Sequence, residues 1–152
     1  MNSPDKSHLT RPVLSFDFDG VINASVVDTE PTSFTDPESW IPFTEMIEHI
    51  RMMSRTHRCV VVTARDNWNQ AELLRFIEIH DIPIEDVFCT DDGPKLLTLL
   101  KVGAVVHFDD RLSVGEEIKG SGIEFWYVNT QDRNWMYMWC SFLFLLSILM
   151  IC

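Results

Sequence analysis

The chain has 152 residues, of which 12 are lysine or arginine and 23 are aspartate or glutamate, so its formal net charge is −11. This length suits one domain of ordinary size and is too short for two full domains. The apolar fraction of 46% excludes general disorder. A chain this acidic gains little counterion-release free energy from a long polyphosphate. Extended nucleic-acid binding is therefore disfavoured, whereas a short contact to a phosphate through a cation remains open.

The predicted elements alternate between strands and helices. A short apolar run, 12–16, indicates a buried strand that ends at Asp17. The segment 21–41 is rich in Asp, Thr, Ser and Pro, which indicates loops that form at most a flap or a small hairpin. The other expected strands are 58–62, 86–89, 104–108 and 123–128, and the expected helices are 42–53, 67–80, 95–101 and 112–119.

Apolar stripes define the inner faces of the first two expected helices. The first stripe consists of Phe43, Met46, Ile47, Ile50 and Met53. The second is predicted to consist of Trp68, Ala71, Leu74 and Ile77. Strands and helices that alternate at this spacing predict an α/β fold, a three-layer Rossmann-like sandwich around a mostly parallel five-stranded sheet.

Polar side chains follow three of the expected strands directly. These are Asp17, Thr63 and Asp109. Ligands of open parallel sheets bind outside the carboxyl ends of the strands, near the point where the strand order reverses. The sequence therefore predicts a site at this edge of the sheet.

Four carboxylates are expected at that edge: Asp17, Asp19, Asp109 and Asp110. They would repel one another unless a cation or raised pKa values offset their charge. This many oxygen ligands suits Mg²⁺, which commonly keeps a substrate phosphate in its shell. In such a site one aspartate can attack phosphorus and a second can transfer protons.

Thr63 and Lys95 are the expected phosphate-binding partners of these acids. The Thr63 hydroxyl can donate a hydrogen bond to a phosphoryl oxygen, and Lys95 can supply positive charge. Lys101 is the alternative lysine, but it lies near the end of its helix, where it can simply complement the helix dipole.

The same residues resemble the four ordered motifs of the haloacid dehalogenase superfamily. The motifs are Asp17-Phe18-Asp19-Gly20-Val21, Val61-Val62-Thr63-Ala64-Arg65, Lys95 and Phe108-Asp109-Asp110-Arg111. The first motif alone would also suit a turn or a calcium loop. The resemblance covers roughly residues 13 to 128. It implies a phosphatase rather than a dehalogenase, because the dehalogenases of this family lack the second acid, Asp19.

The resemblance also implies individual roles. Asp17 would be the nucleophile, and Asp19 would be the general acid/base, with its backbone carbonyl on the metal. Thr63, Ala64 and Lys95 would bind phosphate. Asp17, Asp19, Asp109 and Asp110 would form the Mg²⁺ site, and the choice between the last two as direct ligand stays open.

The candidate substrate contacts are Arg65 and Trp40. For Arg65, and for Arg111, a surface ion pair is the commoner role of such an arginine. Trp40, Trp68 and Trp126 each also have an interpretation as core residues, and it is clearest for Trp68 and Trp126 because they lie within predicted elements. Only Trp40, at the end of the flap, is kept as a candidate contact.

No interval between the motifs is long enough for a folded cap domain. By resemblance, an uncapped member has an open site that accepts bulky substrates. Ile82-Pro83 and His107-Phe108-Asp109-Asp110-Arg111 also show a weaker similarity to polynucleotide 3′-phosphatase domains and 5′(3′)-nucleotidases. This similarity favours a phosphorylated small molecule, a nucleotide or a nucleic-acid end as substrate. The alternatives are a phosphate- or nucleotide-binding module without turnover and a phosphoprotein phosphatase.

The ends of the chain differ from the catalytic segment 13–130. Residues 1–12 are polar and show no secretory signal, and Cys59 and Cys89 are expected as reduced core thiols, so a cytoplasmic location is predicted. The run 135–152 has 18 residues, none of them charged and 16 of them apolar. As a helix it would span about 27 Å. It is interpreted as a membrane anchor, with a packed terminal helix or a non-native end as alternatives.

Overall fold

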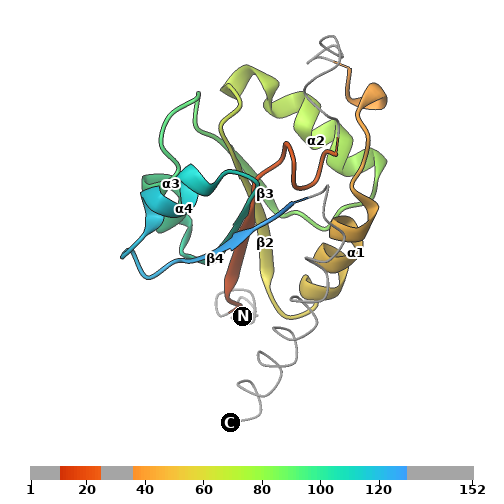
Figure 1. Cartoon of the computed structure of the whole chain (residues 1–152). Coiled ribbons are helices and arrows are strands. Elements are labelled where there is room, and N and C mark those ends of the chain that lie inside the picture. The colour runs from red at the N-terminus through yellow and green to blue at the C-terminus, as the bar shows by residue number, and fades with distance from the viewer. Residues whose placement is uncertain (1–10, 25–35, 130–152) are drawn as a thin grey trace, which may run out of the picture.

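The protein is described by a computed structural model that covers residues 11–24 and 36–129 (Figure 1). The strands are β1 (Val13–Phe16), β2 (Arg58–Thr63), β3 (Asp86–Cys89), β4 (Ala104–Asp109) and β5 (Glu124–Tyr127). The helices are α1 (Thr44–Met53), α2 (Gln70–Ile79), α3 (Leu96–Val102) and α4 (Leu112–Ile118), with short 3₁₀ turns η2 (Pro37–Ser39) and η3 (Asn67–Asn69). These bounds match the predicted strands within about two residues.

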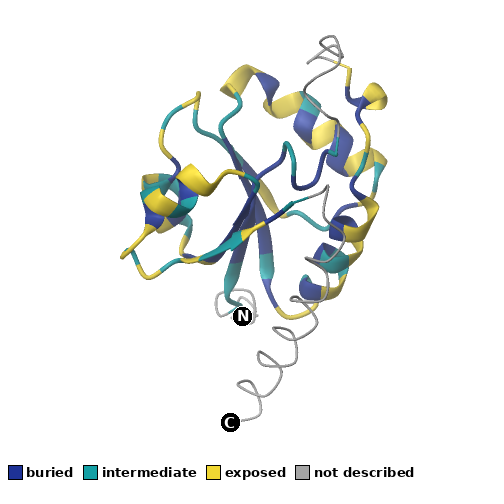
Figure 2. Ribbon diagram, viewed as in Figure 1, coloured by how far each residue is buried: buried dark blue, intermediate teal, exposed yellow. Residues whose placement is uncertain are grey.

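All neighbouring strands of the sheet are parallel, in the order β3-β2-β1-β4-β5. Helices α1 and α2 cover one face of the sheet, and α3 and α4 cover the other (Figure 1). The central strands between these layers are buried (Figure 2). The predicted three-layer α/β sandwich is therefore confirmed.

Each face of the sheet has its own apolar cluster. The larger one, under α1 and α2, includes Leu14 and Phe16 of β1 and Phe108 of β4. The smaller one, under α3 and α4, includes Val60 and Val62 of β2. Successive side chains of a strand point to opposite faces of the sheet, so the continuous apolar run of β2 contributes residues to both clusters.

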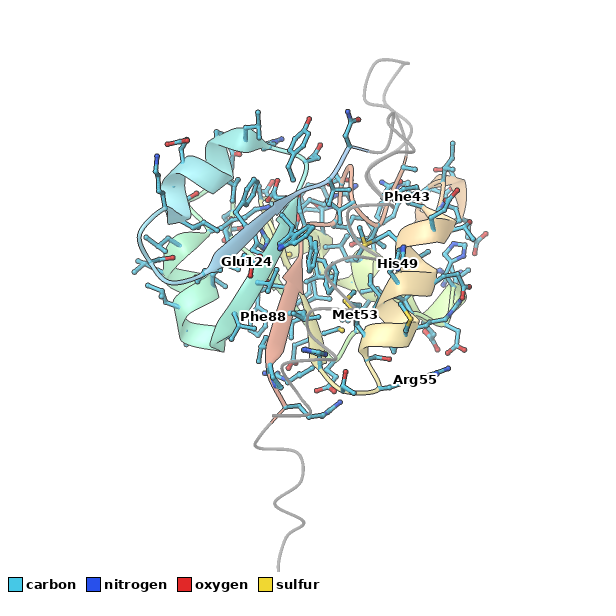
Figure 3. The ribbon with its side chains drawn as sticks, turned by 60° about the horizontal axis from the view of Figure 1, so that its bottom comes forward. Phe43, His49, Met53, Arg55, Phe88 and Glu124 are labelled. Carbon is cyan, nitrogen blue, oxygen red and sulfur yellow. The ribbon has the colours of Figure 1, made fainter. Side chains whose placement is uncertain are left out.

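Helix α1 buries the stripe that its sequence predicts. Met46, Ile47, Ile50 and Met53 are all buried, and Phe43 precedes the helix in the same cluster. In Figure 3 the helix lies alongside the sheet, with Met53 on its inner side and Arg55 pointing away. The apolar spacing of three to four residues therefore predicted correctly which face of this helix is buried.

Helix α2 buries a different stripe from the predicted one. Leu73, Phe76 and Ile77 are buried, whereas Leu74 is exposed and Trp68 is 63% exposed. The predicted stripe keeps a constant spacing of three residues, whereas an α-helix has 3.6 residues per turn, so Leu74 lies off the face that Leu73, Phe76 and Ile77 form. Trp68 precedes α2, in the 3₁₀ turn η3. The indole of Trp68 lies outside the core and donates a hydrogen bond to Asp66 (3.1 Å), so its interpretation as a core residue was wrong.

The flap is described only at its base. The Ala24 N–H donates to the Ile41 carbonyl (2.7 Å), and the Phe43 N–H donates to the Ile22 carbonyl (2.8 Å). Isolated bridges also link Asn23 to Asp19 and to Pro42. The base is thereby attached to the loop that follows β1. Residues 25–35 of the expected flap lie outside the described residues.

The described cysteines are free thiols. Cys59 is buried as predicted, and Cys89 is half-buried. Within 11–24 and 36–129, no helix has both the length and the apolar character needed to cross a membrane. The expected anchor at 135–152 lies outside those ranges.

Candidate functional site

The strand order reverses between β1 and β4. From β1 the chain proceeds to β2 and β3 on one side, and it then returns to place β4 on the other side of β1. Asp17 follows β1 directly, and its N–H donates to the Phe108 carbonyl of β4 (2.8 Å). Asp109 is the last residue of β4. Both acids therefore lie at the position where open parallel sheets bind ligands.

Lys95, the residue before α3, joins these two acids. Its Nζ lies 3.0 Å from Oδ1 of Asp17 and 2.7 Å from Oδ2 of Asp109. Lys95 is only 3% exposed and Asp109 is fully buried. A buried ammonium needs such partners, because its transfer from water is otherwise costly. Lys101, the alternative lysine, lies near the other end of α3 and is exposed.

The pKa values of this buried group reflect both burial and charge. Burial raises the pKa of Asp17 to about 7, although Lys95 opposes the shift. Burial also acts to raise the pKa of Asp109, but hydrogen bonding from His107 and the charge of Lys95 outweigh it, so that pKa lies below its ordinary value. The pKa of Lys95 is raised, because the two carboxylates outweigh the effect of burial.

Asp110 brings a third carboxylate to the site. One ligand atom from each of Asp17, Asp109 and Asp110 lies within 4.8 Å of the others. Burial and the neighbouring Asp109 raise the pKa of Asp110. Its Oδ1 is buried and has no hydrogen-bond partner among the described residues. A divalent cation would satisfy this oxygen and offset the repulsion, so these residues fit Mg²⁺.

Gly20 makes room for this cluster. Its φ is +76°, a conformation that favours glycine, and a Cβ added there would overlap the Asp110 carboxylate. The glycine of the Asp17–Val21 segment is therefore required both by the turn after β1 and by the close approach of Asp110.

The Asp19 side chain does not belong to the three-carboxylate cluster. Its oxygens accept hydrogen bonds from Nε (2.7 Å) and Nη2 (2.8 Å) of Arg65, and Asn23 donates a further one (3.1 Å). Arg65, proposed from sequence as a substrate contact, thus forms a two-point ion pair with Asp19. Of the four carboxylates predicted to lie together, Asp17, Asp109 and Asp110 form the cluster, and the Asp19 side chain is paired with Arg65 instead.

Trp40, a candidate substrate contact from the sequence, lies in the core. It is 4% exposed and packs against Phe18 and Phe76, with ring centroids 5.5 and 5.7 Å away. The Arg65 guanidinium lies over its ring at 4.3 Å. Packing of the indole therefore supports Arg65, and through Arg65 the position of Asp19.

The expected phosphate-binding segment begins with Thr63, the last residue of β2, at the same edge of the sheet. Thr63 is buried, and its hydroxyl oxygen accepts a hydrogen bond from the Arg65 N–H (3.3 Å). The carbonyl of Ala64 accepts from the Asp92 N–H (2.7 Å), which attaches the loop after β3 to this segment. Arg111 is exposed, and its N–H donates to Oδ1 of Asp109 (2.9 Å).

Two residues outside the sequence motifs extend the buried polar group. His107 Nε2 lies 2.9 Å from Oδ2 of Asp109, and His107 Nδ1 lies 2.8 Å from the Ser15 hydroxyl. Both residues are fully buried. Neither residue was predicted as part of the site, although each is a polar side chain two residues before a strand-end acid in an otherwise apolar strand, which is a visible signal.

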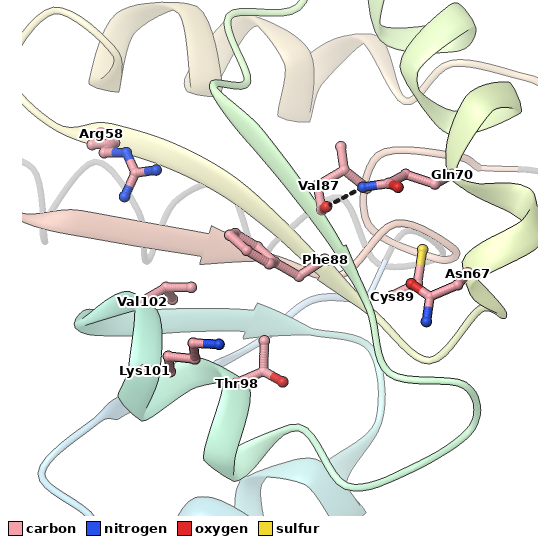
Figure 4. Close-up of a pocket in the computed structure, with 9 residues that line it drawn as sticks. All are labelled: Arg58, Asn67, Gln70, Val87, Phe88, Cys89, Thr98, Lys101 and Val102. Carbon is pink, nitrogen blue, oxygen red and sulfur yellow. Dashed lines mark hydrogen bonds between the residues drawn. The ribbon is translucent and has the colours of Figure 1, made fainter.

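A separate cavity of about 410 Å³ lies along the edge strand β3, between α2 and α3 (Figure 4). Its lining includes Phe88, Lys101 and Gln70, and the Gln70 amide donates to the Val87 carbonyl (2.9 Å). None of the proposed site residues lines this cavity, which is distinct from the carboxylate cluster.

Comparisons with known proteins support the fold. No family model and no curated protein sequence matches the chain. It is similar to a chain in the structure of the Pnkp1/Rnl/Hen1 RNA repair complex, with 14% identity and a TM-score of 0.65 over 84% of this chain and 45% of that chain. It is also similar to a chain in another structure of the Pnkp1/Rnl/Hen1 complex, with 15% identity and a TM-score of 0.63 over 79% of this chain and 47% of that chain. This chain thus spans about half the length of the chains it matches.

Proposed function

We propose that this protein is a Mg²⁺-dependent phosphomonoester hydrolase that acts through an aspartyl-phosphate intermediate. The observation that carries the proposal is the placement of Lys95 between Asp17 and Asp109, near a buried Asp110 oxygen that has no hydrogen-bond partner within residues 11–24 and 36–129. A purely structural ion pair would not need the third carboxylate. A phosphate and a cation together account for all four groups.

In the proposed reaction an oxygen of Asp17 attacks phosphorus, and the ester P–O bond breaks. The leaving oxygen takes a proton from Asp19. Water then attacks the phosphorus of the aspartyl phosphate and gives a proton to Asp19, and the bond between Asp17 and phosphorus breaks to release phosphate. In the described structure both oxygens of Asp19 accept hydrogen bonds from Arg65, so Asp19 would turn away from Arg65 when it carries the proton.

The described geometry favours Asp110 as the acid that would contact Mg²⁺ directly. Both oxygens of Asp109 already accept hydrogen bonds, from Lys95 and His107 on Oδ2 and from the Arg111 N–H on Oδ1. Bound Mg²⁺ would supply positive charge to the phosphoryl oxygens. Lys95 adds a fixed charge beside Asp17, and the Thr63 hydroxyl is a further candidate donor.

The substrate class we propose is a nucleotide or the terminal phosphate of a nucleic acid. Exposed acids, Asp66, Asp91 and Asp92, lie in the loops that follow β2 and β3. They would repel a long phosphate backbone but leave room for one end. The likeness in fold to a chain of an RNA repair complex makes phosphorylated nucleic-acid ends the first substrates to test.

The proposal is tested by hydrolysis of p-nitrophenyl phosphate with and without Mg²⁺, for wild type and Asp17→Asn. We expect turnover that depends on Mg²⁺ and is abolished by the substitution, because an amide cannot act as the nucleophile. Thermal melts check that the variant is folded. Lack of turnover in the wild type, with Mg²⁺ binding retained, would instead support a binding module.

A panel of phosphate esters then identifies the substrate class. Nucleoside 3′- and 5′-monophosphates, 3′-phosphorylated oligonucleotides and a phosphopeptide are compared by kcat/KM. Preference for a nucleotide or an oligonucleotide end supports the proposed class. A preference for the phosphopeptide contradicts it.

A further inference from the structure

The polar residues beneath the proposed site form a continuous buried chain. Ser15 and His107 are register partners on β1 and β4. On the next positions of the same face, Asp17 and Asp109 meet Lys95. His107 therefore contacts the site from the sheet side, where neither substrate nor solvent reaches it, since its exposure is 0%.

The hydrogen bonds of His107 define its tautomer. A carboxylate only accepts, so Nε2, which faces Oδ2 of Asp109, must carry a proton. Nδ1 then accepts from the Ser15 hydroxyl at 2.8 Å. The reverse assignment, with Ser15 donating to the Val106 carbonyl, would require a doubly protonated imidazole. That form also carries a proton on Nε2, so the hydrogen bond from His107 to Asp109 is the same in both cases.

We propose that His107 is a positioning residue, which fixes the Asp109 carboxylate through its Nε2–H so that Asp109 holds Lys95 against Asp17 and keeps the metal-binding carboxylates in place. This inference rests on the proposed function. Oδ2 of Asp109 accepts from both His107 and Lys95. Without His107 the carboxylate can rotate toward Lys95, and the contact between Lys95 and Asp17 is no longer fixed.

The test compares His107→Leu with His107→Gln. Leucine removes the donor, whereas the glutamine amide offers an N–H at nearly the position of Nε2. We expect His107→Leu to lower kcat and weaken Mg²⁺ binding, measured by calorimetry, by about 10- to 100-fold, as is typical for partners of metal ligands. KM should change little, because His107 does not reach the substrate. His107→Gln should recover most of both losses.

Ile50→Val is the matched control. Ile50 is a fully buried residue of α1 on the other side of the sheet. Its substitution should lower the melting temperature without changing kcat or Mg²⁺ affinity. If His107→Leu retains wild-type kcat and Mg²⁺ affinity, or if folded His107→Gln is as impaired as His107→Leu, the positioning role is wrong.

The tautomer of His107 can be measured independently of enzyme activity. Long-range proton–nitrogen NMR of the wild type should show a protonated Nε2 and an unprotonated Nδ1 for His107. An Nδ1–H tautomer overturns the inference, whatever the enzyme assays show. Lack of both Mg²⁺ binding and turnover in the wild type overturns the proposed function instead, and the NMR result remains decisive for the contact with Asp109.

Discussion

Two adjacent pairs of residues on β1 and β4 show how differently the two faces of the sheet are used. Phe16 and Phe108 stack at 4.8 Å on the face under α1 and α2. One position earlier on each strand, Ser15 and His107 form a buried hydrogen bond on the opposite face. The same strands therefore supply apolar packing on one side and an ordered polar chain on the other. Stability and chemistry should thus be separable by mutation.

Among the variants that separate the two faces, Lys95→Met should have the largest effect. The substitution removes the charge between Asp17 and Asp109, and loss of one such stabilising group typically lowers kcat by about 10²- to 10³-fold. It also leaves buried carboxylates without their partner, so melting temperature is measured alongside hydrolysis.

Lys101→Met is the matched control for Lys95→Met, because Lys101 is an exposed lysine near the other end of α3. Its substitution should change neither kcat nor stability measurably. Equal loss of activity in the two variants would show that general positive charge, and not the contact of Lys95 with the acids, is what matters.

Ile50→Ala should affect only stability. Ile50 is fully buried in the apolar cluster under α1 and α2, on the face of the sheet opposite to Ser15 and His107. Removal of a buried side chain of this size lowers the free energy of unfolding by about 2–5 kcal/mol. Urea denaturation measures this loss, and Mg²⁺ affinity of the folded variant should equal that of the wild type. A weakened Mg²⁺ affinity would show that the two faces are coupled.

The smallest effect is expected at Cys59, on the face under α1 and α2. Burial raises the pKa of this thiol to about 12. The thiol therefore stays protonated at pH 8, and iodoacetamide should modify it only when the protein is unfolded in urea. Peptide mass spectrometry distinguishes it from the other cysteines. Rapid modification of Cys59 in the native protein would mean that this face opens to solvent.

Simple periodicity predicted most of the fold because the strands are short apolar runs with clear ends. The strand 86–89 and the buried stripe of α1 were predicted correctly. The stripe of α2 was not, because its predicted members are spaced by three residues throughout, and such a series drifts around a helix that has 3.6 residues per turn. The buried face is the one with the spacing of three and four that Leu73, Phe76 and Ile77 share.

The candidate site was predictable where strand ends bring residues together, as for Asp17 and Asp109. Its interior was less accessible to sequence reasoning. The pairing of Arg65 with Asp19, and the burial of Trp40 beside it, depend on how the flap base packs on α2. Such contacts join segments far apart in the chain, and no local pattern reports them.

The base of the flap has a consequence for how this fold can vary. Because the Ala24 N–H donates to the Ile41 carbonyl, these two residues stay adjacent whatever the number of residues between them. In general, doubling the length of a closed loop costs only about 0.6 kcal/mol of closure entropy. Variants that differ in the number of residues between Ala24 and Ile41 should therefore keep the same sheet.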